Sequence, residues 1–350
     1  MLATESSAAA SPDLVAPPPE PHAAWKHIVA PAEPFLVAVG ERLKDQINAF
    51  ESDIASYASY ALTGQGKQLR PALVALSGGA TGQLEDSHVM VAVIIEMVHL
   101  ATLVHDDVMD EARIRRGRLT LAAKWGHEIS VLLGDCLFAQ ALKLAASFPT
   151  PEICRAVSAA TNTVCSGEIL QTQRRKNFEF SRADYFKVLQ MKTGELFALS
   201  CDLGAHLSGA GAAQRSALRN YGMAIGTAYQ IYDDCLDVFG SEAAAGKSLG
   251  TDLTKGKLTL PMLLALEQAS AAERSSLKAM VREWDTGQLP GLLKILRDHR
   301  TLEGSKRAVH QYLDSARERL GALPETESRT ALASLTDYLA RQTDDLGGPR

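Results

Sequence analysis

The sequence has few cysteines, and they do not form a recognisable site. The 350 residues include five, at positions 136, 154, 165, 201 and 235, and none of them stands in a CxxC pair. Their odd number and their spacing exclude a disulfide framework and a cysteine zinc site, so we expect free thiols in a reducing compartment. No apolar segment precedes the first lysine, Lys26, which argues against a signal peptide. We therefore expect a cytoplasmic protein.

The sequence also lacks the marks of a β protein and of a nucleic-acid-binding surface. Aromatic residues are only 6% of the chain, Gly-rich linkers are absent, and no segment alternates apolar and polar residues as a half-buried strand does. The net charge is −5 and the lysines and arginines are scattered, which argues against a nucleic-acid partner. With 46% hydrophobic residues the chain can bury a large core. We expect an all-α fold, a single large helical bundle around a deep central cavity.

Two regions differ in composition. Residues 1–24 are rich in Ala, Pro and Ser, with three consecutive prolines at 17–19, and we expect a disordered arm there. Residues 25–345 carry helical periodicity and are expected to form one folded domain. Its longest apolar run, Val89 to Val104, predicts a helix that is buried on most sides. Because this run is shorter than the ~20 residues of a membrane span and contains Glu96 and His99, we expect no membrane anchor.

Three aspartates end this apolar helix. Asp106, Asp107 and Asp110 are at positions i, i+1 and i+4, which lie within an arc of about 100° on a helix and so share one face. Clustered carboxylates repel one another and need positive charge nearby. Magnesium suits them, because it binds one or two carboxylates and takes its other ligands from water and phosphate oxygens. A lone cluster of this kind is more often a solvated helix end.

The same spacing occurs again 127 residues later, at the end of another mostly apolar segment, YQIYDDCLDVFG. The second cluster consists of Asp233, Asp234 and Asp237. Two such clusters are hard to explain as chance surface acids. If they face each other across a cavity, they could hold several magnesium ions and a diphosphate between them.

Basic residues accompany the clusters in four segments. Lys67 and Arg70 begin a helix, where an anion would be stabilised, although this signal is weak alone. Arg115 and Arg116 follow the first cluster and suit bidentate phosphate contacts. Lys192 lies within an apolar helix, so it has either a buried anionic partner or a path to the surface.

The fourth basic segment is a loop punctuated by glycines, GKSLGTDLTKGKLTLP, which supplies Lys247, Lys255 and Lys257. It could close over a diphosphate as a lid, or be simply a solvated loop. Two acids inside apolar patterns, Asp135 and Glu168, are expected to be hydrogen-bonded structural residues.

These segments resemble a known family. GKQLRP, LVHDDVMDEARIRRG, the KTG segment, YQIYDDCLDVFG and the glycine-punctuated loop are similar to the five ordered motifs of trans-isoprenyl diphosphate synthases, the polyprenyl synthetases, over residues 35–345. The resemblance implies an isoprenoid synthase fold, usually as a homodimer. It also implies head-to-tail condensation of isopentenyl diphosphate with a geranyl, farnesyl or geranylgeranyl diphosphate, with about three magnesium ions when substrate is bound.

The resemblance also implies roles for single residues. The six aspartates would hold magnesium. The residues that would contact the allylic diphosphate or line the position of the allylic cation are Arg115, Lys192, Thr193, Gln230, Lys247 and Lys257. The residues that would hold isopentenyl diphosphate are Lys67, Arg70, His99 and Arg116. The chain departs from the family pattern at Gly194, Ser248 and Tyr229, none of which removes a charge.

Product length depends, by the same resemblance, on residues one and two turns before the first cluster. Here these are small or aliphatic and include Val98, Ala101 and Thr102, and Ala145 on the following helix could keep the tunnel open further. Because no aromatic residue blocks this level, we expect a long product of roughly C30–C45. The alternative is a short-chain synthase that makes farnesyl or geranylgeranyl diphosphate.

Two other functions are compatible with parts of the pattern. A class I terpene cyclase also uses an aspartate cluster, but its second metal motif usually follows an Asn/Ser/Glu pattern. A non-catalytic subunit of another prenyl synthase typically loses aspartates, whereas both clusters are intact here.

Overall fold

The computed structural model describes residues 21–63, 66–115, 117–240 and 249–347, without side chains for 21–24. The described part is almost entirely helical, as predicted. Its first half contains α1 Pro21–Val29, η1 Ala30–Ala32, α2 Glu33–Asn48, α3 Ser52–Leu62, α4 Leu69–Gly79, α5 Asp86–Met109, β1 Ile114–Arg115, β2 Arg118–Leu119, α6 Leu121–Trp125, α7 His127–Ala146 and α8 Glu152–Gln173. Its second half contains α9 Arg182–Leu189, η2 Gln190–Gly194, α10 Glu195–Leu207, α11 Ala212–Phe239, α13 Thr251–Thr254, α14 Leu260–Gln268, α15 Ala271–Arg282, η3 Thr286–Gln288, α16 Leu289–Asp298, α17 Thr301–Leu320 and α18 Glu327–Asp344.

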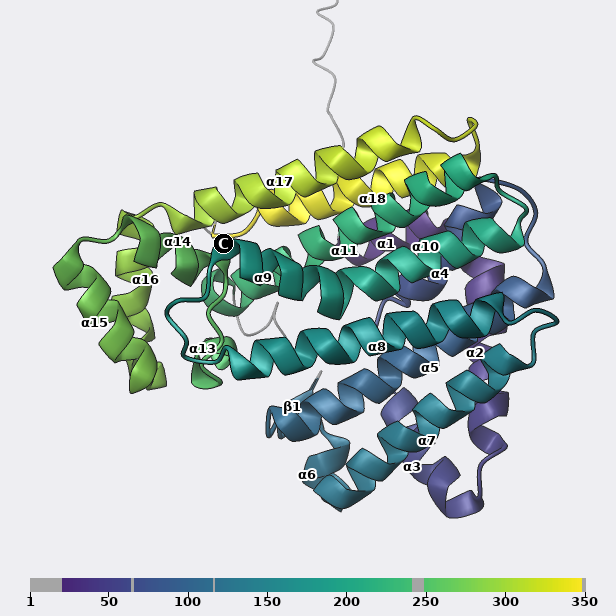
Figure 1. Cartoon of the computed structure of the whole chain (residues 1–350), viewed down its shortest axis with the longest axis horizontal. Helices are drawn as coiled ribbons and strands as arrows, with labels where there is room; N and C mark the ends of the chain where they lie inside the picture. Colours follow the sequence, from purple (N-terminus) through teal and green to yellow (C-terminus); the bar gives the residue numbers. More distant parts are fainter. Residues whose placement is uncertain (1–20, 64–65, 116, 241–248, 348–350) are drawn as a thin grey trace, which may run out of the picture.

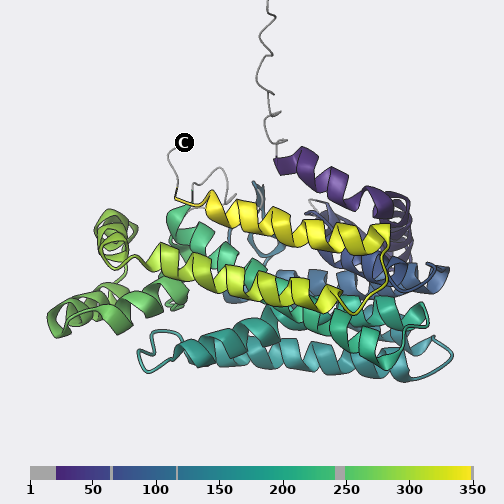
Figure 2. The same ribbon diagram turned by 90° about the horizontal axis from the view of Figure 1, so that it is seen from above.

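Helix α5 lies at the centre of the bundle. It packs against α2, α4, α7 and α10, and α10 in turn packs against α4 and α11. The residues from Val91 to Ile95 have no exposed surface, which is why almost every position of this helix is apolar. Helices α17 and α18 run along the bundle beside α11, and α14, α15 and α16 extend from one end of it (Figures 1 and 2).

Four local features differ from the sequence-based expectation. Helix α1 begins at Pro21, inside the arm predicted for residues 1–24. A short hairpin, β1–β2, follows the first aspartate cluster, and its turn includes Gly117 at φ 74°. The apolar pattern from about Thr120 to Ser147 predicts one helix, but the structure breaks it at Gly126, whose φ of 92° no α-helix tolerates. The segment between α9 and α10 is a single π-helical turn, η2.

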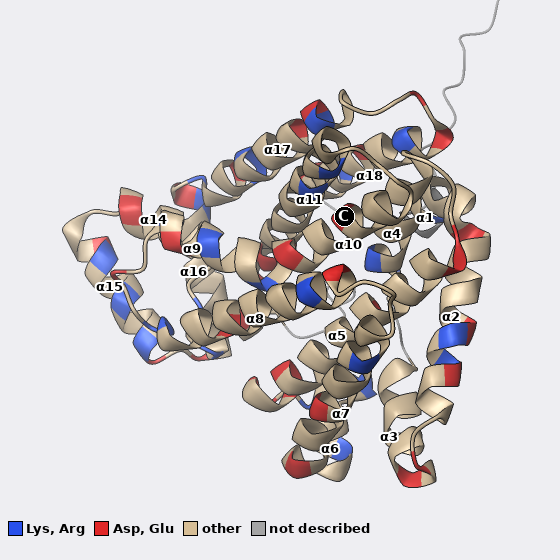
Figure 3. Cartoon of the chain, turned by 45° about the vertical axis from the view of Figure 1, so that its right-hand side comes forward, with Lys and Arg blue, Asp and Glu red and all other residues tan. Residues whose placement is uncertain are grey.

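Helices α5 and α7 are both long and apolar enough to cross a membrane. The apolar window of α5 is 67% buried inside the fold, as in the core helix of a soluble protein, whereas that of α7 is only 33% buried. The burial of α5 therefore argues against a membrane span, whereas the length of this helix does not. Lysines and arginines are scattered over several helices, including α2, α15 and α17, with acidic residues among them (Figure 3).

Candidate functional site

The three aspartates at the end of α5 are bound by four different segments. Asp106 Oδ2 lies 3.5 Å from the ammonium of Lys192. Asp107 Oδ1 accepts a 2.8 Å bond from Nε of Arg115 in strand β1. Among the described residues, no three acidic, histidine or cysteine side chains are grouped closely enough to hold an ion by themselves. A magnesium ion here would therefore need oxygen ligands from a substrate or water.

The third aspartate, Asp110, bridges two cations. Its Oδ2 accepts a 2.8 Å bond from Nζ of Lys257 and its Oδ1 a 3.0 Å bond from Nη2 of Arg175. Burial alone would raise the pKa of Asp110, but the charges of Lys257, Lys192 and Arg175 lower it overall. Lys257 comes from the glycine-punctuated loop, so the predicted lid does reach the first aspartate cluster.

Lys192 lies in the π-helical turn η2, and its ammonium has anionic partners inside the protein. It forms an ion pair with Glu168 of α8, a 3.1 Å hydrogen bond to Oε1 of Gln171, and the contact with Asp106. Burial would lower the pKa of Lys192, but Asp106 and Glu168 raise it above its usual value. Of the two interpretations left open by the sequence, the buried anionic partner is confirmed.

Two glycines allow the helices to approach η2 closely. A Cβ at Gly167 of α8 would lie 2.8 Å from Cβ of Met191 and 3.0 Å from the backbone N of Lys192. A Cβ at Gly194 would lie 2.6 Å from the sulfur of Met223 on α11. The departure from the family pattern at Gly194 thus has a packing reason. π-helical turns are frequent at functional sites because they re-aim side chains within a helix.

The second cluster is tied to η2 by a chain of hydrogen bonds. Thr193 Oγ1 donates to Oε1 of Gln230 at 2.8 Å, and Nε2 of Gln230 donates to Oδ1 of Asp234 at 2.9 Å. The hydroxyl of Tyr185 donates to the other oxygen of Asp234 at 2.6 Å. Burial, together with the negative charge of Asp252, raises the pKa of Asp234 to about 8. Gln230 shares the face of the cluster, as the sequence predicted.

Asp237, one of the predicted metal ligands, accepts hydrogen bonds from the lid. It has no exposed surface, and its Oδ1 accepts a 2.6 Å bond from the hydroxyl of Thr251. Its Oδ2 accepts a 3.1 Å bond from the backbone N–H of Asp252, and its carbonyl oxygen accepts a 2.8 Å bond from the N–H of Gly250. A carboxylate at this helix start satisfies backbone N–H groups that have no partner within α13. The structure thus uses Asp237 to hold the lid.

The predicted isopentenyl diphosphate residues lie on neighbouring helices. Nζ of Lys67, just before α4, donates to the hydroxyl of Tyr338 at 2.7 Å. The guanidinium of Arg70 lies 4.9 Å from the ring centroid of Phe197. His99 lies on α5, which packs against α4. Two further predicted residues, Arg116 and Lys247, lie outside the described residues.

The predicted chain-length residues belong to the packed interior. Val98 and Ala101 on α5 and Ala145 on α7 are buried, and Thr102 is partly buried. The hydroxyl of Thr102 donates to the carbonyl of His99 at 2.7 Å, which is the usual way for a threonine to satisfy itself within a helix. Because α5 and α7 pack directly against each other, these small residues set how closely the two helices approach.

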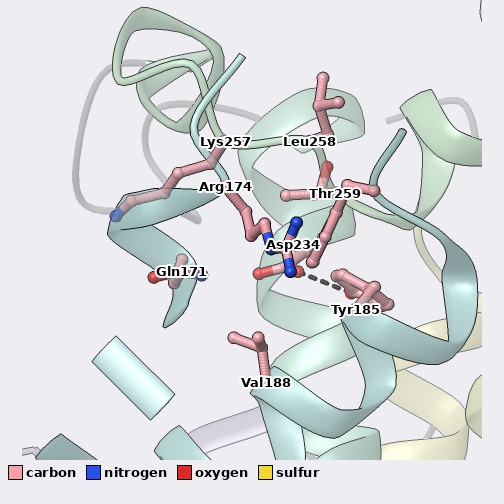
Figure 4. Close-up of a pocket in the computed structure, with 9 residues that line it drawn as sticks. Gln171, Arg174, Tyr185, Val188, Asp234, Lys257, Leu258 and Thr259 are labelled. Atoms are coloured by element: carbon pink, nitrogen blue, oxygen red, sulfur yellow. Dashed lines mark hydrogen bonds between the residues drawn. The ribbon is translucent and has the colours of Figure 1, made fainter. Parts of the chain in front are cut away.

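A small cavity lies beside the second cluster. Its volume is about 20 Å³, and its lining includes Gln171, Arg174, Tyr185, Asp234 and Lys257 (Figure 4). This is room for about one water molecule. Lysine and arginine side chains occupy the carboxylates of Asp106 and Asp110, so a metal ion would have to displace these cations.

Three site residues were not identified from the sequence. Glu168 was predicted to be structural but is paired with Lys192, and its position as an acid in an apolar helix was the available signal. Tyr185 and Arg175 gave no signal, because their partners Asp234 and Asp110 are 49 and 65 residues away. Helix α9 begins with a capping box of Ser181 and Asp184, which the spacing of these two residues predicts and the structure confirms.

The polyprenyl synthetase family model matches residues 51–295, a range that includes both aspartate clusters and the lid. The octaprenyl diphosphate synthase of Haemophilus influenzae is 33% identical over 310 residues, which are 88% of this chain and 94% of that protein. The crystal structure of a decaprenyl diphosphate synthase from Rhodobacter capsulatus matches with a TM-score of 0.86 at 32% identity, over 91% of this chain and 99% of that one. A polyprenyl synthase from Caulobacter crescentus, in complex with calcium and isoprenyl diphosphate, matches with a TM-score of 0.86 at 31% identity, over 90% and 97%.

Proposed function

The chain belongs to the polyprenyl synthetase family, and we propose from this that it condenses isopentenyl diphosphate with an allylic diphosphate into a long trans-polyprenyl diphosphate. The observation that carries the proposal is the meeting of Asp106 and Asp110 with Lys192 and Lys257, from three segments far apart in the sequence. Carboxylates that could hold metal thus lie beside cations that could hold phosphate. The named relatives that make octaprenyl and decaprenyl products support a long product.

We propose magnesium as the metal. The donors fit, because Asp106, Asp110, Asp233 and Asp234 offer hard oxygen ligands, and Asp106 and Asp110 lie beside cations that a bound ion could replace. The presence of calcium in the complex of the Caulobacter relative supports a divalent cation. When bound, magnesium would neutralise charge on the allylic diphosphate as it leaves.

The residues of the chain would act on both substrates. Lys192, Lys257 and Arg115 would stabilise the negative charge that grows on the leaving diphosphate as its C–O bond breaks. Thr193 and Gln230 would flank the allylic cation and, through their mutual hydrogen bond, keep their oxygens in fixed positions.

Isopentenyl diphosphate would be held by Lys67, Arg70 and His99, with Arg116 as the resemblance implies. Its double bond would attack the allylic carbon and form the new C–C bond. The resulting cation would then lose a proton to the departing diphosphate. The atoms balance without any further reactant, because the bonding pair of the broken C–O bond leaves with the diphosphate.

We propose a homodimer formed through α7 and α8. The outward face of α7 carries the exposed apolar residues Val131, Leu132 and Leu142, and that of α8 carries Ile169. No charged residue except the buried Glu168 occurs in α8 between Arg155 and its end at Gln173. Exposed apolar side chains that gather on neighbouring helices in this way are frequent at protein interfaces. All five cysteines are free thiols, which supports a cytoplasmic location.

An incorporation assay tests the proposed function. The purified protein would receive radiolabelled isopentenyl diphosphate, farnesyl diphosphate and magnesium, and the products would be separated by chain length. A ladder ending between roughly C30 and C45 is the expected result. Products that stop at C20 would identify a short-chain synthase, and no incorporation would overturn the proposal.

A further inference from the structure

The loop after α8, residues 174–180, contacts the end of the lid through its backbone. The backbone N–H of Lys176 donates to the carbonyl of Gly256 at 2.7 Å. Its Nζ donates to the carbonyl of Arg282, at the end of α15, at 3.0 Å. Lys176 adopts φ 55°, a left-handed conformation that is costly for a lysine and is kept only where the surroundings hold it. The loop therefore has one fixed position relative to the lid.

The lid is shaped to accept this contact. Gly256 has φ 69°, and a Cβ there would lie only 2.6 Å from Cγ of Lys176. A glycine at this point lets the two backbones approach. Lys257 is the next residue, so the contact between Lys176 and Gly256 holds the backbone from which Lys257 reaches Asp110.

This arrangement places the side chain of Arg175 beside the first aspartate cluster. Its Nη2 binds Oδ1 of Asp110 at 3.0 Å while Lys257 binds Oδ2, and the side chain of Arg175 is only 24% exposed. Two cations thus share a single carboxylate. The Nε–H of Arg175 is buried and has no hydrogen-bond partner within the part of the chain that the structure describes. A guanidinium with a free donor beside Nη2 can make the two parallel bonds that phosphate oxygens accept.

We propose that Arg175 binds the diphosphate of the allylic substrate, a contact that the sequence motifs do not assign. In the substrate-free protein Arg175 is held on Asp110, and it turns to the phosphate oxygens when Asp110 is taken up by other ligands. Lys176 is a positioning residue, which holds the loop so that Arg175 and Lys257 approach the same oxygens. This inference rests on the proposed function for its substrate, but it is testable with inorganic pyrophosphate alone.

The direct test is calorimetric titration of magnesium and inorganic pyrophosphate into the wild type, Arg175→Gln and Arg175→Lys. We expect Arg175→Gln to weaken binding about tenfold or more, as the loss of a charge-assisted phosphate contact does. Arg175→Lys should recover part of this loss, because it restores the charge without the planar fork. Arg182→Gln is the matched control: Arg182 begins α9, is half exposed and pairs with Glu267, so this variant should bind like the wild type.

Steady-state kinetics give a second measurement. Arg175→Gln should raise KM for the allylic diphosphate and leave KM for isopentenyl diphosphate unchanged, whereas a general structural defect would change both. Equal pyrophosphate binding by wild type and Arg175→Gln would overturn the inference, as would a wild type that does not bind pyrophosphate. A wild type that binds pyrophosphate but incorporates no isopentenyl diphosphate would refute the proposed function alone, and the binding comparison would still decide the role of Arg175.

Discussion

At the scale of single residues, the charged side chains of the site neutralise one another as internal ion pairs. Lys192 neutralises Glu168 and Asp106 while Lys257 and Arg175 neutralise Asp110, and all of these side chains are at most one quarter exposed. Unpaired charges so deep in the protein would be costly. The same cations are therefore available for a phosphate group once other ligands take over the carboxylates.

Lys192→Met should lower kcat by about 10²–10³-fold, because it removes a preorganised cation from the leaving diphosphate. It also leaves Glu168 and Asp106 without their neutralising partner. Lys187→Met is the control, since Lys187 lies on the preceding helix α9 and is exposed. Single-turnover rates with a saturating allylic substrate measure the effect. A rate within twofold of the wild type would show that Lys192 is only structural.

The pKa of Asp234 predicts an unusual pH dependence of stability. Its folded pKa of about 8 is above its ordinary value of 3.8, so between these pH values the folded protein holds a proton that the unfolded chain has released. The free energy of unfolding of the metal-free protein should therefore fall as the pH rises through this window.

Urea denaturation of metal-free wild type and Asp234→Asn, at pH 5.5 and 7.5, measures this dependence. The wild type should lose more stability over the interval than the variant, because asparagine does not titrate. An equal slope in both proteins would assign the effect to other groups.

At the scale of elements, short irregular segments position the reacting groups. Lys192 and Thr193 are adjacent in the π-helical turn η2, but they bind side chains of different helices. Lys192 pairs with Glu168 of α8, and Thr193 bonds to Gln230 of α11. The short helix α13 is fixed by the carboxylate of Asp237. The turn η2 interrupts the helical stretch between α9 and α10, and α13 is a separate short helix within the lid.

Thr251→Val should loosen the lid. The variant keeps the shape of the side chain but removes the hydroxyl that donates to Asp237, a bond to a charged group that contributes about 1.5–3 kcal/mol. We expect faster amide exchange over residues 250–257 and a higher KM for the allylic diphosphate. Thr254→Val removes an exposed hydroxyl that donates only to the carbonyl of Gly250 within the same short segment, so it should change both by much less. Unaltered amide exchange in Thr251→Val would show that the bond between Thr251 and Asp237 does not hold the lid.

Ala101→Phe should shorten the product from the long chain to C15–C20, because the ring would fill the space beside α5 one turn before the cluster. Ala101 has no exposed surface, and overpacking of this kind costs about 1–3 kcal/mol of stability. Thermal unfolding must therefore accompany product chromatography. A folded, active variant with unchanged product length would contradict the proposed path of the chain.

At the scale of the whole molecule, the apolar outer face of α7 is the feature that a single chain leaves unexplained. Leu132 is 60% exposed and Val131 is 41% exposed. Leu132→Glu should convert the proposed dimer to a monomer, because it places a charge in the apolar interface. Val37→Glu is the matched control, since Val37 is 61% exposed but lies on α2.

Sedimentation equilibrium distinguishes the two outcomes. The wild type and Val37→Glu should show a mass near twice the 37.6 kDa of one chain, and Leu132→Glu a mass near that of one chain. A monomeric wild type would refute the dimer and leave the proposed reaction intact.

The all-α class and the ends of some helices could be predicted because they depend on local patterns. Mostly apolar segments predict α5 and α11, and the serine and aspartate at the start of α9 form their capping box within three residues. The hairpin β1–β2 could not be predicted, since its two-residue strands are too short for a period. The π-helical turn was missed for a similar reason: its pattern continues that of the flanking helices.

The sequence by itself determined the chemistry available to this protein, which consists of two aspartate clusters, a set of lysines and arginines, and small residues along α5. Only the tertiary structure decided how these groups are used. It assigned Asp237 to the lid, paired Glu168 with Lys192 and directed Arg175 to Asp110. The reason is that spacing along one helix fixes which residues share a face, whereas the partner of a buried charge comes from a segment distant in sequence. Lys257 and Asp110, for example, are 147 residues apart in the sequence, but Nζ of Lys257 lies 2.8 Å from Oδ2 of Asp110.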